Sequence, residues 1–484
     1  MNTTLRVFGT IFILLIIVST GYSNDDLGPL LRRLPATANT VVVINVKAIR
    51  QLSGDKPDAA RSQIIAGAIV PPSVDLVVFA THLEPGALET RKTIGLIQLN
   101  HPVTLDDLMD KTGGQTVDLG GESAIVHPRK GFYVMLAPNL IGIGRNVSRQ
   151  DVVRGLKFAR TNDKVVLPEC LTSAIASAAD APIFGALDLE HSLEVQTVRG
   201  RLAASDLMAG RDKAEIDAIG SLVAGVKGVV LTVDGPQLDR CELRLDFSTA
   251  VGDRGEMIKS LFLQTLEDLG ASLNDFEKAK VVTADKTVKL QVKLSGEGLI
   301  RIMSIFMPPA PEPQSRSAAP KLEANGASID VTRRYYQAID PMLRDLRRRT
   351  QTATDYPRTA TWHDSYASSI ENMSTRYVDP DMVKFGQTVA TRLRAISASL
   401  RGVAVNVDAL QSGLTYIAAG TGSIFGGSSI AVDSNIAQTR TRQAEMIRKD
   451  ANRRLEIWDS IDKDQRNLVK LMRERFNLNL EITN

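Results

Sequence analysis

Residues 40–306 alternate between strand-like and helix-like hydrophobic patterns, and the same order occurs twice. The first pass begins with the apolar run at 40–46 and the second with the run at 183–189. Each pass predicts the order β-α-β-β-α-β-β-α. Single helices between hairpins are typical of α+β folds, and each βαββαβ stretch resembles a ferredoxin-like core. We therefore predict a duplicated α+β region with mostly antiparallel sheets, divided into units 24–160 and 161–306.

A proline-rich segment follows the second unit. Residues 307–328 contain five prolines among alanines and serines. Such a composition forms neither helix nor sheet, because proline lacks a backbone donor and restricts the chain. The segment is predicted to be a semi-stiff linker between the α+β region and the rest of the chain.

Beyond the linker, residues 329–484 show helical periodicity only. Two shorter helices are expected first, followed by a long helix from Met382 in which apolar residues alternate at steps of three and four between Leu393 and Leu414. A second long helix is expected over about 434–476. The spacing is that of a coiled-coil seam and predicts a helical bundle around a long antiparallel hairpin.

Three segments of this module resemble a known family. They are TATWHDSYASSIENM, VDPDMVKFGQTVATRLRAISASLRGVAVNVDAL and VDSNIAQTRTRQ. They are similar to a C-terminal helical module of uncharacterised exported proteins from planctomycete-type bacteria. The resemblance covers roughly residues 331–480, about one domain's length. It implies a helical fold and an exported protein, and it carries no activity and no catalytic residues.

The N-terminus has the parts of a secretory signal. Arg6 precedes an apolar run from Val7 to Val18, and small or polar residues follow up to Ser23. A helix needs roughly 20 apolar residues to cross a bilayer, and this run is shorter. We predict a signal peptide at residues 1–23 and export to the periplasm, the cell envelope or the medium. An uncleaved anchor is the alternative.

Export makes the two cysteines relevant, since oxidising compartments permit disulfides. Cys241 occupies an inward position of an alternating strand pattern, and Cys170 lies at the head of an expected helix. A Cys170–Cys241 bridge is one interpretation. Two buried thiols that pack as small apolar groups are the other.

The composition is that of a globular protein with little net charge. The 484 residues include 43% hydrophobic and 23% charged residues, with Lys+Arg 58 against Asp+Glu 55. A net charge of +3 provides no overall field that would attract nucleic acid, and we expect no such partner. One dense basic cluster exists, formed by Arg344, Arg347, Arg348 and Arg349. We interpret it as a complement to a helix C-terminus.

No catalytic, cofactor-binding or metal site can be assembled from the sequence. Gly142-Ile143-Gly144 lacks the third glycine of a dinucleotide-binding loop, and a tight turn explains the pair. The five histidines have no metal-site spacing. They are His82, His101, His127, His191 and His363. We expect His363 to be a hydrogen-bonded surface histidine.

The segment between the two long helices is uncharged from Gln411 to Val432. The candidate tip residues are Tyr416, Ile417, Ile424 and Phe425. One hypothesis makes them an interaction tip that touches a partner or, peripherally, a membrane. An ordered connector that folds back is the simpler interpretation, because apolar loop residues usually pack locally.

These patterns favour an exported, non-catalytic envelope or extracellular protein that binds or scaffolds another macromolecule. The observation behind this hypothesis is an architecture without a catalytic set. The alternative is a hydrolase or small-ligand binder with its site in the cleft between the two α+β units. Pockets between structural units commonly hold such sites.

Overall fold

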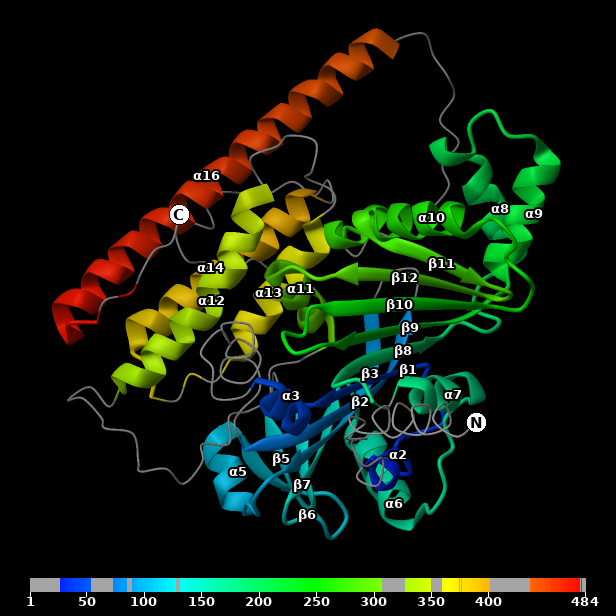
Figure 1. Ribbon diagram of the computed structural model, residues 1–484. Coiled ribbons are helices and arrows are strands. Elements are labelled where there is room, and N and C mark those ends of the chain that lie inside the picture. Colours follow the sequence, from blue (N-terminus) through cyan, green and yellow to red (C-terminus); the bar gives the residue numbers. More distant parts are fainter. Residues whose placement is uncertain are drawn as a thin grey trace, which may run out of the picture.

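The computed structural model describes residues 27–53, 73–84, 89–112, 114–127, 131–178, 180–306, 327–349, 359–373, 375, 377–400, 436–478 and 480. This part of the chain combines a large antiparallel sheet with helices on both faces and a helical region at the C-terminal end (Figure 1). The predicted α+β fold class is confirmed at this level. The signal-like segment, most of the linker and the hairpin tip lie outside the described residues.

The described strands form one sheet of twelve in the order β11-β12-β10-β9-β8-β1-β2-β3-β7-β6-β5-β4. Every pair between neighbours in this order is antiparallel. The strands are β1 (Thr40–Asn45), β2 (Val74–Glu84), β3 (Glu89–Leu99), β4 (Gln115–Asp118), β5 (Ser123–His127), β6 (Gly131–Ala137), β7 (Leu140–Arg145), β8 (Ile183–Asp188), β9 (Val226–Asp234), β10 (Arg240–Phe247), β11 (Lys280–Ala284) and β12 (Thr287–Lys293).

The two halves of the sheet repeat one strand order and share a central pair. Outward from the centre, the first half runs β1, β2, β3, β7, β6 and the second runs β8, β9, β10, β12, β11. The halves meet where β1 pairs with β8, from Thr40 opposite Leu187 to Ile44 opposite Ile183. In a ferredoxin-like core another strand lies between the two strands that a helix connects, which is why the arrangement is called a split βαβ. Here β1 and β2, which α3 connects, are direct neighbours and antiparallel, so ferredoxin-like cores are not confirmed.

Helices cover both faces of the sheet, and side chains alternate between them along each strand. In β1, Val42 and Ile44 belong to the core that the sheet shares with the helical region, whereas Val41 and Val43 pack under α2 and α7. The helices of the α+β part are α2 (Gly28–Leu31), α3 (Val46–Ser53), α5 (Leu105–Thr112), α6 (Arg149–Thr161), α7 (Glu169–Ala178), α8 (Val195–Ala203), η2 (Asp206–Met208), α9 (Lys213–Ala224), α10 (Gly255–Asp268), η3 (Asn274–Lys278) and α11 (Gly296–Phe306).

The C-terminal helices pack as a bundle in which the long helices are antiparallel. Arg392 pairs with Asp464 at 2.7 Å and Arg475 pairs with Asp379 at 2.8 Å, so the two helices run in opposite directions. The helices are α12 (Ile329–Arg349), α13 (Ala360–Asn372), α14 (Pro380–Leu400) and α16 (Ile436–Phe476). The seam predicted from Leu393 to Leu414 is described up to Leu400, and its remainder lies outside the described residues.

A buried ion pair attaches the bundle to the sheet region. Arg301 of α11 donates from Nε and Nη2 to the two carboxylate oxygens of Asp345 in α12, each at 2.9 Å. The Tyr366 hydroxyl donates to the same carboxylate at 2.7 Å, and Arg301 also donates to the Ser272 carbonyl. Both charged side chains are 1% exposed. Because a buried charge without a partner is costly, the pair fixes where α12 and α13 sit against α11.

The two cysteines are free, so the disulfide interpretation is wrong. Cys241 faces the core that the sheet shares with the bundle. Cys170 begins α7 on the opposite face, where its Sγ lies 3.6 Å from the Lys227 carbonyl oxygen. The sheet therefore separates the two sulfur atoms. The alternative interpretation, two buried thiols, is correct for Cys241, whereas Cys170 is only half-buried.

The expectation of a surface position for His363 is also wrong. Its side chain is buried, and Nδ1 hydrogen-bonds the Thr359 carbonyl at 2.9 Å. The ring meets Trp458 of α16 edge-on, with 6.2 Å between centroids. Burial disfavours the charged imidazolium and lowers the pKa of His363 to about 4. The packing of α13 inside the bundle, which periodicity alone does not show, produces this environment.

The arginine cluster serves the bundle itself. Arg344 pairs with Asp340 one turn earlier at 2.9 Å, and Arg347 pairs with Asp462 of α16. Helix α12 ends at Arg349, as the helix-dipole interpretation requires. The side chains of Arg348 and Arg349 lie outside the described residues.

Removing one partner of the buried ion pair is expected to destabilise the protein strongly. Arg301→Met leaves the Asp345 carboxylate buried without its cation, which costs about 3–5 kcal/mol of unfolding free energy. Arg333→Met is the matched control, because the Arg333–Asp330 pair on α12 is exposed and such pairs contribute less than about 1 kcal/mol. Urea unfolding followed by circular dichroism measures both losses. Equal losses of unfolding free energy in the two variants would contradict a stabilising role for the buried Arg301–Asp345 pair.

His363 is expected to make the protein less stable in mild acid. The pKa of this imidazole is 6.5 when exposed and about 4 in the folded chain, so between these values the unfolded chain binds a proton that the folded chain does not. Stability therefore falls as the pH drops through this window, by roughly 3 kcal/mol in total. Asp345, Asp364 and Arg301 contribute smaller electrostatic effects on this imidazole.

Urea titrations across this pH range, with His363→Phe beside the parent protein, measure the effect. The His363→Phe curve is expected to lack this part of the pH dependence. His191→Asn serves as control, since His191 is exposed and its positive φ of 63° is one that asparagine tolerates. A parent curve that is flat between pH 6.5 and 4 would refute the expectation.

Candidate ligand-binding cavity

Helix α6 covers the outer part of the first half of the sheet, and its sequence fixes where it begins. Ser148 and Asp151 form a capping box, in which each side chain hydrogen-bonds the backbone N–H of the other residue. The box satisfies N–H groups that would otherwise be unpaired at the helix start. Val152 and Leu156 then pack against β5 and β6 with Ala124 and Val134. One edge of α6 is thereby held against the sheet.

Under α6, strand β7 presents glycines where other strands present side chains. Ile141 and Ile143 point into the core on the opposite face, and the alternate positions Gly142 and Gly144 face the helix. A Cβ at Gly144 would lie 2.7 Å from Val147 Cγ2, and one at Gly142 would lie 3.2 Å from Leu136 Cδ1. Glycine inside a strand commonly marks a place where a ligand or another backbone approaches closely. These two glycines leave the floor beneath α6 flat.

Helix α6 itself carries a glycine on the side that faces this floor. Gly155 shares a helical stripe with Asp151 and Phe158, which also line the space. A Cβ added at Gly155 would have no heavy atom within 4 Å. Glycine within a helix costs roughly 0.5–1 kcal/mol relative to alanine. The helix thus carries a destabilising residue beside open space.

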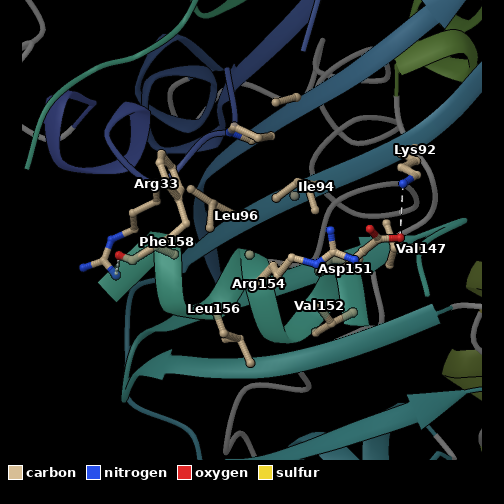
Figure 2. Close-up of a pocket in the computed structure, with 18 of the residues that line it drawn as sticks. Arg33, Lys92, Ile94, Leu96, Val147, Asp151, Val152, Arg154, Leu156 and Phe158 are labelled. Carbon is tan, nitrogen blue, oxygen red and sulfur yellow. Dashed lines mark hydrogen bonds and ion pairs between the residues drawn. The ribbon is translucent and has the colours of Figure 1, made fainter. Parts of the chain in front are cut away.

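The result is a cavity of about 600 Å³ between α6 and the sheet. Figure 2 shows Arg33 and Phe158 near one end of α6, and Lys92 with Asp151 near the other. The cavity lies within the size range of small-molecule sites. Its apolar lining comes from β3, β6, β7 and α6 and includes Ile94, Leu96, Val134, Leu136, Val147, Val152, Leu156 and Phe158.

Charged side chains surround this apolar lining, and most of their charge is positive. Lys92 of β3 reaches the Asp151 carboxylate, with 3.1 Å between Nζ and Oδ2. Arg33, which precedes β1, donates from Nη1 to the Ala159 carbonyl in the last turns of α6 at 3.1 Å. Arg154 is exposed on α6 and makes neither a hydrogen bond nor an ion pair among the described residues. Three cations and one carboxylate therefore line the cavity.

The carboxylate of Asp151 holds several neighbours through one of its oxygens, Oδ2. It accepts hydrogen bonds from the Ser148 hydroxyl at 2.9 Å and the Ser148 backbone N–H at 3.1 Å, in addition to Lys92. These bonds, led by the one from the Ser148 hydroxyl, lower the pKa of Asp151 to about 2. The group stays ionised at neutral pH, so it has a structural role at the helix start.

Several polar side chains of the lining already have partners. The Thr81 hydroxyl is committed to the Lys92 carbonyl at 2.7 Å, and Asp151 holds its own ion pair. Among the described residues, no group of three or more histidine, cysteine, aspartate or glutamate side chains is placed to hold a metal ion. What the cavity offers a ligand is apolar surface with cations at its edge.

The structure places the sequence-predicted candidates in different locations. Gly142 and Gly144 lie inside strand β7, so the tight-turn interpretation is wrong. Both line the cavity, and the side chains of Val147 and Leu136 pack close over them. The tip residues Tyr416, Ile417, Ile424 and Phe425 lie outside the described residues. The cavity itself is within residues 33–159, in the first unit and away from the boundary with the second.

Sequence reasoning missed Arg33, Arg154, Gly155 and Phe158 as lining residues. One signal was available, because two glycines at alternating strand positions are followed by a glycine in the next helix. That pattern removes side chains from two facing elements. The contributions of Arg33 and Ile94 could not be seen, since only the sheet pairing brings their elements under α6.

Among the described helices, none has the length and hydropathy needed to cross a membrane. No family model matches the chain, and no curated protein matches it. Solved structures of TP0453 in crystal forms III, I and IV overlap with TM-scores of 0.33, 0.33 and 0.32 at 12%, 13% and 11% identity. They cover 56%, 57% and 56% of this chain and 96%, 97% and 95% of TP0453. Similarity at this level supports no conclusion about fold or function.

Proposed function

We propose that this protein binds a small, mainly apolar molecule in the cavity beneath α6. The observation that carries the proposal is the absence of side chains on both facing surfaces, at Gly142 and Gly144 of β7 and at Gly155 of α6. A core normally fills such space, because each apolar contact made there stabilises the fold. A ligand that covers Ile94 and Leu136 would remove their half-buried apolar surface from water.

The N-terminal pattern supports export, and we propose that binding takes place outside the cytoplasm. Arg6 and the apolar run Val7–Val18 have the order of a secretory signal. The resemblance of residues 331–480 to modules of exported bacterial proteins points in the same direction. The protein would then hold its ligand in the periplasm, in the envelope or outside the cell.

Binding of another macromolecule is the second proposal. It rests on the apolar side chains between Tyr416 and Phe425, which also allow peripheral membrane contact. Small-ligand binding ranks first because the residues that support it belong to one described site. Replacing residues 413–430 by a Gly-Ser linker and comparing the partners captured from envelope extract tests the second proposal. Unchanged partner lists would end it.

We also infer that the two sheet halves arose by duplication. The support is the shared strand order outward from the β1–β8 pair, together with the repeated β-α-β-β-α-β-β-α pattern. The halves have since diverged, because the first carries additional outer strands and the glycine-lined cavity. Binding is accordingly assigned to the first half alone.

Filling the cavity from α6 is expected to weaken binding while the fold is kept. Gly155→Met places a side chain in open space and should raise the unfolding free energy by about 0.5–1 kcal/mol, since methionine favours helix over glycine. The affinity for the neutral apolar dye N-phenylnaphthylamine, measured by fluorescence titration, should fall about tenfold or more, because overpacking costs about 1–3 kcal/mol.

Gly200→Met is the matched control for this experiment. Gly200 also lies inside a helix, α8, with no heavy atom within 4 Å of an added Cβ, and it does not line the cavity. It should show the same helix stabilisation and unchanged dye affinity. The proposed function is refuted if the parent protein shows no saturable dye binding. It is also refuted if Gly155→Met and Gly200→Met bind the dye with the same affinity.

A further inference from the structure

The charges around the cavity indicate what kind of apolar molecule it takes. Lys92 and Asp151 neutralise each other across 3.1 Å, which leaves the positive charges of Arg33 and Arg154. The walls between these groups are mainly apolar or glycine, with Thr37, Thr81 and His82 also in the lining. A neutral hydrocarbon would use the walls and leave the positive edge without a counter-charge. An amphiphile with an anionic end would use both.

The two remaining arginines differ in what they already do. Arg33 donates to the Ala159 carbonyl, where its cation also complements the C-terminal end of the α6 dipole. Arg154 has no such partner among the described residues and lies along α6 between the two ends of the cavity in Figure 2. Its planar guanidinium can donate two parallel hydrogen bonds to a carboxylate. Arg154 is therefore the group available to an incoming anion.

We propose that the ligand is an apolar monocarboxylate, with its hydrocarbon part beneath α6 and its carboxylate bound by Arg154. This inference rests on the proposed function and assigns its ligand class. A ligand with one negative charge is favoured over a doubly charged phosphate. The reason is that, among the described residues, Arg154 alone of the cavity's cations has neither an ion-pair partner nor a contact at the end of α6. The Asp151 carboxylate contacts Ser148 and Lys92. In the described part of the chain it makes no hydrogen bond or ion pair with Arg154.

The test compares three ligands that share one hydrocarbon chain and differ in the end group. Dodecanoate, dodecanol and dodecyl phosphate are each titrated against the full chain loaded with N-phenylnaphthylamine, below their micelle-forming concentrations. The parent protein should bind dodecanoate about five- to tenfold more tightly than dodecanol, as expected for a charge-assisted pair near the surface. Added salt should reduce this preference, because the mouth is open to solvent.

Substitution at Arg154 isolates the group responsible. Arg154→Gln should lower the affinity for dodecanoate to that for dodecanol and leave the affinity for dodecanol unchanged. Arg154→Lys should keep part of the preference, since it keeps the charge and loses the paired donors. Arg160→Gln is the control, because Arg160 lies on the same helix, pairs with Glu122 at 2.7 Å and does not line the cavity. It should behave as the parent does.

The failures of the two proposals are distinguishable. If the dye does not bind, the proposed function is refuted. If the dye binds and none of the three ligands displaces it, the cavity remains a binding site and the monocarboxylate assignment is wrong. If all three bind and Arg154→Gln changes nothing, the cavity is a binding site and the carboxylate assignment is wrong. Tighter binding of dodecyl phosphate than dodecanoate in the parent, lost in Arg154→Gln, would also overturn the assignment in favour of a phosphate monoester.

Discussion

The backbone pairing between β1 and β8 is the constraint on which the rest of this structure depends. It joins two strand groups of the same order into one sheet, and the alternation along every strand then gives that sheet two faces. Since ladder hydrogen bonds bring the halves together edge to edge, no cleft opens between them in the plane of the sheet. The described cavity accordingly lies on one face of the sheet, under α6.

The two faces are covered differently, and the difference explains both the stability and the cavity. One face shares its core with the bundle, where the Arg301–Asp345 pair and the Tyr366 hydroxyl fix the contact between α11 and the bundle helices. The other face is covered by the separate helices α2, α6 and α7. Separate helices need not pack along their whole length. At Gly155 of α6 the space beside the helix is open, and Gly142 and Gly144 of β7 line the same cavity.

Sequence patterns predicted the helices and strands better than they predicted the tertiary surroundings of individual side chains. The long C-terminal helix expected over about 434–476 was readable, because helical periodicity depends on neighbouring residues, and α16 spans Ile436–Phe476. His363 was placed at the surface, since its helix shows one apolar stripe and periodicity does not reveal a second helix packed on the other side. The Cys170–Cys241 bridge failed for a similar reason, because a strand pattern does not say which face of a sheet another element covers.

The sequence by itself determined which segments form strands and helices, where α6 begins, and that glycine occupies facing positions in β7 and α6. It also determined the near-neutral total charge and the signal-like N-terminus. Only the tertiary structure decided that those glycines enclose a cavity, that Lys92 and Asp151 cancel each other there, and that Arg154 is left beside it. The reason is physical. Local patterns act over a few residues, whereas the walls of the cavity come from residues more than a hundred positions apart, between Arg33 and Ala159, which only strand pairing and helix packing bring together.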